Sequence, residues 1–581
     1  MSTVYHAPLT DIEFLLLEVL RADTLGSLPG FAHLDADAVR IVLAQGARFA
    51  EKVLSPINGP GDAEGARLIE GRVRYPVGFA DAYVRYAADG WLGLDMPEHV
   101  GGQGLPRVLQ VAFAEMTNGA NLAFSMLPVT IRAAAKLLLE HGSPEIVEQF
   151  VPGLVDGSCA ATIVISEPQA GSDVGRIQTL AVPQPDGRYR LTGTKVFISN
   201  GDHELTPQIA HMVLARTPGS AAGTRGVSLF LVPKFRGTGN DRRPNGVQVV
   251  RIEHKMGLKA SPTCVLEFQD SEAIRIGQEG RGLQAIFAMV NTMRLEVAVQ
   301  GVGIAGAATG RALRHASERL QGGLPQGKPA AILDHPDVRR MLLTMRARTG
   351  ALRGLVYEAA LALDRGEAGD AETLALSQWL LPICKAYGTD TALEVANLAV
   401  QVFGGYGYIT DSGVEQYVRD VRVGAIYEGT NGIQAIDLVT RKLAGDGGVR
   451  LRQYLARMRA DVERARGEPA VAAIREATEN GARQLEQVSD HLLARDGGSA
   501  AADLEAGAVA YLRLAGLVGG AWMWLRIATA SPGPGALHRL NRSTAEFYAR
   551  VLGAEAQLHV AQCLSGAAVT VLDPEQWRAA Q

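Results

Sequence analysis

The stretch RYRLTGTKVFIS, Arg188 to Ser199, decides the fold class because it is rich in residues that form β-strands. Short runs of the same kind surround it, and turn residues separate them. They are ATIVIS (161–166), HMVLAR (211–216), GVSLFLVP (226–233), GVQVVRIE (246–253) and CVLEFQ (264–269). These runs predict an antiparallel sheet or barrel between Ala160 and about Ile276.

Helical patterns lie on both sides of this β-rich region. They run from Asp11 to about Gly157 and again from Gly282 to about Leu443. In IRAAAKLLLEHG (131–142) the apolar residues share one helical face, and Gly142 is expected to end the helix. Since strands do not alternate with helices, the sequence predicts an α+β fold and not a doubly wound nucleotide-binding fold.

The change of texture along the chain predicts four domains. They are an N-terminal helical domain (1–157), a central β-barrel domain (158–278), a C-terminal helical, catalytic domain (279–445) and an extra helical domain (446–581). The turn-rich stretch AGDGG (444–448) would be the hinge before the last of them.

Composition excludes several function classes. The 581 residues carry a formal net charge of −4, so we expect no nucleic-acid partner. The four cysteines lie far apart without a CxxC pair, which predicts a reducing, cytoplasmic location and argues against a metal site. The N-terminus lacks the basic region of a secretory signal, and the apolar run LAGLVGGAWMWL (514–525) is too short to span a bilayer. We therefore expect no stable membrane insertion.

One glycine motif is a weak signal. GVGIAG (301–306) matches the dinucleotide-binding pattern G-x-G-x-x-G, but the preceding MVNTMRLEVAVQ is helical in pattern and not a strand. Close helix packing at small residues is the better interpretation.

Two segments in the β-rich region have residues suited to a polar, ring-bearing cofactor. VISEPQAGSD (164–173) leaves a strand and offers hydroxyls at Ser166 and Ser172 beside the flexible Gly171. GTKVFISNG (193–201) places Phe197 and Ser199 on one face of a strand. Each pattern alone is also that of an ordinary turn or strand.

Two more segments lie in the second helical region. QVFGGYGYITD (401–411) has glycines that admit close backbone approach, and IYEGTNGIQ (426–434) carries the single acid Glu428 after an apolar run. Placing a carboxylate there costs free energy unless it is paired or neutral. Thr430 and Asn431 are candidate N-caps of a helix whose apolar face includes Ile436 and Val439. An isolated glutamate before a helix is more often a solvated end residue.

Together, and in this order, the four segments resemble the acyl-CoA dehydrogenase family over about Leu94 to Leu443. The resemblance implies FAD as cofactor and an acyl-CoA thioester as substrate. It implies that SEPQAGSD holds flavin and substrate, that KVFISNG flanks the isoalloxazine ring, and that FGGYGY and IYEGT complete the site. Two departures are Phe197, where many members carry Trp, and Gly432, where many carry Gln.

The length of the chain resembles the longer bacterial branch of that family, in which a C-terminal extension forms a further helical domain. Arg319 matches best the arginine with which relatives reach a neighbouring subunit's flavin, so the resemblance implies a homo-oligomer, a dimer at least. The cofactor-binding residues it implies are Ser166, Ser172, Phe197, Ser199, Arg319, Gln401, Gly405 and Thr430. The substrate-binding residues it implies are Ser172, Asn291, Arg294 and Gly429.

The resemblance also gives Glu428 a role. As the catalytic base it would take the α-proton of the thioester, while the β-hydride passes to the flavin and the electrons pass on to electron-transfer flavoprotein. The product would be a trans-2-enoyl-CoA. Two other carboxylates, Glu296 and Glu415, remain rival bases at this stage, because some branches supply the base from a different helix.

Two other functions share this fold. The first is a DNA-associated alkylation-response flavoprotein, which uses a basic C-terminal domain; residues 445–581 hold 15 Arg plus Lys and 15 Asp plus Glu, which disfavours it. The second is a flavin oxidase, whose oxygen reactivity no sequence pattern reveals. The length of the acyl chain depends on the size of a pocket around residues 118–130 and Ala425, and the sequence leaves it open.

Overall fold

The computed structural model describes residues 5–237, 241–323, 327, 329–494, 498–567 and 574–580. The chain divides into two compact units. The first comprises Met1–Ala7, Gly30–Leu34 and Ala38–Glu296, and the second comprises Pro8–Pro29, Asp35–Asp37 and Val297–Gln581. The division falls inside helix α8 (Gly282–Glu318). The four predicted domain boundaries stay a prediction.

The first unit begins with helices and two short strands. These are α2 (Ala36–Phe49), α3 (Ser55–Glu64), β1 (Arg67–Ile69), β2 (Arg72–Arg74), α4 (Phe79–Ala88), α5 (Arg107–Ala120), α6 (Leu122–His141) and α7 (Pro144–Asp156). Helix α6 starts at the N-cap Asn121, whose side chain accepts a hydrogen bond from the Phe124 N–H at 3.0 Å. It ends before Gly142, as predicted, and its residues are nearly all buried.

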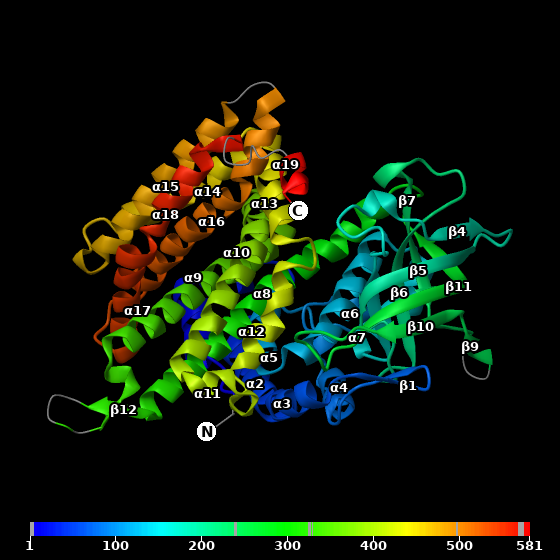
Figure 1. Ribbon diagram of the computed structural model, residues 1–581, viewed down its shortest axis with the longest axis horizontal. Helices are drawn as coiled ribbons and strands as arrows, with labels where there is room; N and C mark the ends of the chain where they lie inside the picture. The colour runs from blue at the N-terminus through cyan, green and yellow to red at the C-terminus, as the bar shows by residue number, and fades with distance from the viewer. Residues whose placement is uncertain are drawn as a thin grey trace. The chain divides into compact units, whose positions relative to one another are not determined.

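The β-rich part of the first unit follows. Its strands are β3 (Cys159–Val164), β4 (Leu180–Pro183), β5 (Tyr189–Ser199), β6 (Gln208–Arg216), β7 (Val227–Pro233), β8 (Phe235–Arg236), β9 (Arg243–Pro244), β10 (Val247–Ile252) and β11 (Thr263–Ile276). The pairings β11–β5–β4–β6–β7–β11 close a ring, with β10 and β3 added at its edges. Figure 1 shows the labelled strands β4, β5, β6, β7, β10 and β11 gathered in one β region at the right of the view.

The predicted α+β class is confirmed, but the sheet is not purely antiparallel. Strands β3 and β6 pair in parallel, with Cys159 opposite Gln208 and Val164 opposite Val213. The connection between them runs through β4 and β5, which is long enough for a parallel pairing. Inside the ring the apolar side chains of Leu191, Ile198, Phe230, Leu266 and Phe268 form the core.

The second unit is helical in the described residues apart from one short hairpin. Its elements are α1 (Leu9–Phe14), the end of α8, β12 (Leu320–Gly323), β13 (Pro329–Ala331), α9 (Pro336–Glu367), α10 (Ala371–Phe403), α11 (Gly405–Tyr408), α12 (Glu415–Val421), α13 (Asn431–Ile436), α14 (Val449–Arg464), α15 (Ala472–Leu493), α16 (Gly498–Thr529), α17 (Ala536–Phe547), α18 (Glu555–Leu564) and α19 (Pro574–Ala579). Helices α14, α15, α16 and α18 form a bundle (Figure 1). Helix α16 also contacts α9, α10 and α13, so the C-terminal extension packs on the helices before it.

The glycines of GVGIAG lie within α8, as predicted, and serve helix packing. A Cβ on Gly301 would lie 2.9 Å from the carbonyl oxygen of Gly388 on α10, which is too close for any side chain. The small residue therefore lets the two helix backbones approach. Among the described residues all four cysteines are buried and free, which agrees with the absence of a predicted disulfide framework.

Two helices are long and apolar enough to cross a membrane, namely α6 and the part of α16 from Ala502 to Thr529. In their most apolar windows 89% and 83% of the residues are buried inside the protein. Core helices of soluble proteins pass the same test of length and composition. The run at 514–525 is part of the longer helix α16, so the expectation that it is too short to span a bilayer was wrong, whereas the expected buried helix is confirmed.

Candidate active site

The motif SEPQAGSD forms a tight turn directly after β3. Glu167 and Ala170 exchange two backbone hydrogen bonds of 3.0 Å each, and the carbonyl oxygen of Ser166 accepts the N–H of Val196 at 2.9 Å. Ser172 lies exposed after the turn. The predicted cofactor residues Ser166 and Ser172 thus lie on a segment that is hydrogen-bonded to β5.

A buried ion pair fixes this turn to β5. The ammonium of Lys195 lies 2.8 Å from Oε1 of Glu167, and neither side chain is more than 3% exposed. Lys195 also donates to the carbonyl oxygens of Ile165 at 2.9 Å and Leu214 at 2.7 Å. The hydroxyl of Thr179 donates to Glu167 at 2.6 Å. Both charges therefore have several partners, as buried charges require.

The pair remains ionised at neutral pH. Burial opposes the charge on Glu167, but the ammonium of Lys195 and the surrounding donors outweigh it and lower the pKa of Glu167 to about 2. Burial lowers the pKa of Lys195 to about 8 against the attraction of Glu167, which leaves it protonated near pH 7. Neither residue was among the predicted site residues, although Lys195 is the single charged residue of GTKVFISNG.

Strand β5 carries a bulge beside this lysine. Cys264 pairs with Ile198 and Leu266 with Lys195, so two residues of β5 lie opposite one of β11. Phe197 in the bulge has a φ of 61°, which is rare for an aromatic residue, and its side chain is 68% exposed. Ser199 lies partly exposed two residues on. An exposed ring held in a strained backbone conformation is unusual for a residue with no function.

In the second unit, residues from two distant segments line one cavity of about 470 Å³. Arg319 lies at its wall with Gly405 and Tyr406, and the guanidinium carbon lies 5.4 Å from the centre of the Tyr406 ring. The ring of His315 stacks on Phe403 at 4.1 Å and supports the wall. The structure therefore brings together Arg319 and the FGGYGY segment, which lie more than eighty residues apart in the sequence.

Glu428 lies in a turn that leads into α13. It is partly exposed, and its φ of 55° is left-handed, as is that of Gly429 at 80°. Thr430 is the N-cap of α13, as predicted, and accepts the N–H of Ile433 at 3.3 Å. The Tyr427 hydroxyl donates to Oε1 of Gln300, and burial together with the charge of Glu428 raises the pKa of Tyr427 above its usual value. Tyr427 therefore stays protonated and does not serve as a base.

The apolar face predicted for this segment is only partly buried. Val439 is fully buried, but Ile436 is 39% exposed. The reason is that α13 is only six residues long and continues as a π-helical turn, Asp437–Leu443, which shifts the side chains around the axis.

Four family models match the chain in sequence order. They are the acyl-CoA dehydrogenase N-terminal domain at residues 40–158, its middle domain at 162–271, its C-terminal domain at 280–444 and an acetyl-CoA dehydrogenase C-terminal-like domain at 454–572. The 3-methylmercaptopropionyl-CoA dehydrogenase of Ruegeria pomeroyi is 38% identical over 89% of this chain and 90% of its own. The chain belongs to the acyl-CoA dehydrogenase family. It is an oxidoreductase of the class that dehydrogenates acyl-CoA.

A further sequence relative and a solved structure are also similar to this chain. A butyryl-CoA dehydrogenase of Syntrophomonas wolfei is 31% identical over 81% of this chain and 80% of its own. The crystal structure of Caenorhabditis elegans ACDH-11 in complex with C11-CoA has the same fold, with a TM-score of 0.81 and 22% identity over 94% of this chain and 91% of its own. The similarity to ACDH-11 thus includes the C-terminal extension.

The predicted site residues of this acyl-CoA dehydrogenase fall in both units. Ser166, Ser172, Phe197, Ser199, Asn291 and Arg294 belong to the first unit, and Arg319, Gln401, Gly405, Glu428, Gly429 and Thr430 belong to the second. Asn291 is exposed on α8, whereas Arg294 is only 7% exposed and lies over the ring of Phe287 at 5.8 Å. Gln401 is exposed at the end of α10, and its carbonyl oxygen accepts the N–H of Gly404 at 3.0 Å.

Both rival carboxylates already have an arginine partner. Glu296 accepts a hydrogen bond of 2.6 Å from Arg132, whose other nitrogen donates to Asp95 at 2.6 Å, all in a buried cluster. Glu415 accepts from Arg419 at 2.6 Å. Either carboxylate would have to leave its arginine to act as a base, and the arginine would then be left without its partner.

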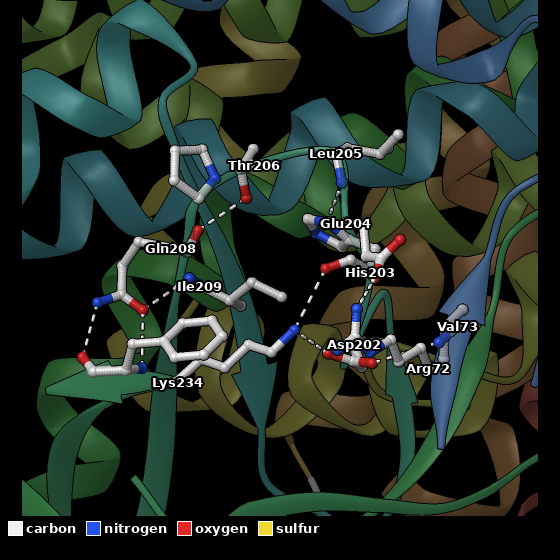
Figure 2. Close-up of polar contacts among 12 residues, drawn as sticks. Arg72, Val73, Asp202, His203, Glu204, Leu205, Thr206, Gln208, Ile209 and Lys234 are labelled. Carbon is white, nitrogen blue, oxygen red and sulfur yellow. Dashed lines mark hydrogen bonds and ion pairs between the residues drawn. The ribbon is translucent and has the colours of Figure 1, made fainter. Parts of the chain in front are cut away.

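The first unit contains a cavity of about 550 Å³, which lies beside the loop that follows GTKVFISNG. Four of its charged groups form two ion pairs (Figure 2): Lys234 pairs with Asp202, and Arg72 pairs with Glu204 at 3.0 Å. Burial lowers the pKa of His203 to about 3, so its imidazole is neutral. None of the predicted site residues lines this cavity. Its lining has three cations, Arg72, Lys234 and Arg242, and two carboxylates, and the guanidinium of Arg242 lies over the Phe235 ring at 3.8 Å.

We predict that Lys195→Met lowers the free energy of unfolding by about 3–5 kcal/mol, because it leaves the buried carboxylate of Glu167 without its counter-charge. Urea unfolding measures this as a fall in the midpoint. The matched control on the same strand is Arg190→Met, which removes a surface pair with Asp270 and should cost less than about 1 kcal/mol. Equal midpoints for the two variants would contradict the role of the pair.

The ion pair of Glu167 and Lys195 also makes the free energy of unfolding depend on pH. Since the folded pKa of Glu167 lies below its ordinary value, its contribution to stability is present above about pH 4.5 and is lost as the pH falls toward 2. The acid loss should therefore be smaller in Lys195→Met than in the parent protein.

Proposed function

We propose that this protein is an FAD-dependent acyl-CoA dehydrogenase that converts an acyl-CoA thioester to a trans-2-enoyl-CoA, with Glu428 as the catalytic base. The observation that carries the proposal is the carboxylate of Glu428, held in a left-handed turn directly before α13 in a chain of this family. A carboxylate at such a position suits proton abstraction next to a thioester carbonyl.

The residues present fit FAD. Phe197 offers an exposed aromatic face, and Ser199 two residues on is partly exposed, which suits a flat ring with polar edges. The cavity with Arg319 and Gly405 offers a cation and an open glycine segment, which suit a pyrophosphate. When bound, FAD accepts the hydride that leaves the β-carbon of the substrate.

The chain's own residues would prepare the substrate for that transfer. Glu428 takes the α-proton, and its backbone N–H holds the thioester oxygen, on which negative charge develops. Tyr427, a protonated donor bound to Gln300, keeps the turn in place. Ser172, Asn291, Arg294 and Gly429 are proposed to bind the acyl-CoA, and Ser166, Ser172, Gln401 and Thr430 to complete the cofactor contacts.

The physiological setting belongs to the same proposal. Electron-transfer flavoprotein would reoxidise the cofactor, and the enzyme would work in fatty acid β-oxidation or a related pathway in the cytoplasm. Four free, buried cysteines support a reducing compartment.

We predict that the purified protein is yellow and carries non-covalent FAD at about one per chain, because Phe197 and Arg319 provide the contacts described above. The visible spectrum measures the flavin, and acid precipitation should release it into the supernatant. A colourless protein that takes up no added FAD would count against the whole proposal.

We predict that Glu428→Gln abolishes rapid flavin reduction while FAD and acyl-CoA still bind. The amide has nearly the same shape but accepts no proton, and loss of a positioned base costs about 10²–10⁴-fold in rate. Anaerobic stopped-flow reduction with butyryl-CoA and with 3-methylmercaptopropionyl-CoA measures it. Glu415→Gln is the matched control and should reduce at nearly the parent rate. A Glu428→Gln protein that is reduced within a few-fold of the parent rate would refute the assignment.

We predict a homodimer at least, formed through the surface near Arg319. Tyr406, Tyr408 and Ile409 are 44%, 87% and 46% exposed there, and such an apolar group on a soluble surface is typical of an interface. Tyr408→Asp should shift the mass measured by light scattering toward the monomer. Val77→Asp, at another exposed apolar side chain, should leave it unchanged. A parent protein that is monomeric and fully active would contradict the dimer.

A further inference from the structure

The turn that carries Glu428 needs support from its surroundings. Glu428 and Gly429 have φ values of 55° and 80°, and a left-handed glutamate is unfavourable unless other contacts hold it. The side-chain nitrogen of Gln434, which is fully buried, donates to the carbonyl oxygens of both residues at 3.3 Å. The ammonium of Lys385 on α10, also fully buried, donates to the Gly429 oxygen at 2.7 Å.

Asn431, the first residue of α13, connects this turn to α10. Its side-chain oxygen accepts from Lys385 at 3.1 Å. Its side-chain nitrogen donates to the carbonyl oxygen of Ala386 at 3.2 Å and to Oδ1 of Asp390 at 2.8 Å. The same nitrogen also donates to the hydroxyl oxygen of Thr389 at 3.0 Å. Four residues of α10 therefore hold one asparagine at the start of α13.

Arg513, in the C-terminal extension, reaches this group. Arg513 on α16 donates to the second oxygen of Asp390, Oδ2, at 3.2 Å. Helix α16 contacts both α13 and α10 along this stretch. A carboxylate bonded at both oxygens is fixed in its rotation, so Arg513 determines how Asp390 presents Oδ1 to Asn431.

We infer that the C-terminal extension positions the proposed catalytic base. Arg513 orients Asp390, and Asp390 together with Lys385 holds Asn431 and hence the Glu428–Gly429 turn. Arg513, Asp390 and Lys385 are positioning residues, since they act on Glu428 through the turn. This inference rests on the proposed function, and it gives the extension a task in the reaction beyond packing. It matters because a displacement of about 1 Å at a reacting group costs about 10²-fold in rate.

The test uses the full-length holoenzyme with Arg513→Met. Two quantities are measured: hydrogen exchange of the backbone amides in residues 424–436, without substrate, and anaerobic flavin reduction by butyryl-CoA, 3-methylmercaptopropionyl-CoA, octanoyl-CoA and palmitoyl-CoA. We expect faster exchange in that segment and a reduction rate lowered about 10-fold, with the half-saturating acyl-CoA concentration unchanged. Arg513→Lys should restore part of the rate, and Lys385→Met should lower it about 10²-fold.

The matched control is Glu555→Gln, which removes another contact between the extension and the preceding helices. Glu555 on α18 accepts from Arg348 on α9 at 2.9 Å, and it makes no hydrogen bond to Asp390 or Asn431 among the described residues. It should leave both the exchange of 424–436 and the reduction rate as in the parent.

The outcomes distinguish a failure of the inference about Arg513 from a failure of the proposed function. If Arg513→Met behaves like Glu555→Gln in exchange and in reduction rate, the extension does not position the base, and the inference is wrong while the proposed function stands. If none of the acyl-CoA esters reduces the parent flavin, the proposed function is wrong, and the inference that Arg513 positions the base is wrong with it. Altered saturation with an unchanged limiting rate would also overturn the inference, because it would place Arg513 in substrate binding.

Discussion

The buried ammonium of Lys195 is the charge around which the candidate cofactor face is organised. It lies inside the β-rich part of the first unit, where an ion without partners costs several kcal/mol, and it therefore requires Glu167 and two carbonyl oxygens around it. Because Glu167 belongs to the turn after β3 and Lys195 to β5, satisfying this charge joins the two motifs. The bulge that exposes Phe197 starts next to the same lysine, so the aromatic face is fixed to the same group.

In the second unit another buried lysine, Lys385, stabilises a motif segment in a similar way. Lys385 donates to the carbonyl oxygen of Gly429 and to Asn431, and so holds a left-handed turn that would otherwise relax. In both units a buried lysine donates a hydrogen bond to a backbone carbonyl oxygen of a motif segment. Because the buried ammonium requires these acceptors, it helps to fix the conformation of the segment. The proposed base, Glu428, is followed by a glycine and by an N-cap two residues on.

Much of the fold and part of the candidate site could be predicted from local patterns. Helix α6 ends at Gly142, GVGIAG is helical, and Thr430 is an N-cap, because helix caps and periodicity depend on neighbouring residues. The exposed Ile436 shows the limit of this method. A π-helical turn after α13 changes the number of residues per turn, and a pattern that assumes a constant helix then places the apolar face wrongly. The parallel pairing of β3 with β6 was missed for a related reason, since strand order is not encoded in any one strand.

By itself the sequence determined the α+β class and the family, because these rest on composition, periodicity and motifs that are contiguous in the chain. It also indicated Glu428 as a candidate base beside two rival carboxylates. Only the tertiary structure decided which charges are partners. Lys195 and Glu167 are 28 residues apart, Lys385 and Gly429 are 44 apart, and Arg513 and Asp390 are 123 apart. The tertiary structure also decided that Phe197 and Glu428 adopt left-handed backbones. The physical reason is that burial makes an unpaired charge or a strained residue costly, and burial is a property of the folded chain that no short segment carries.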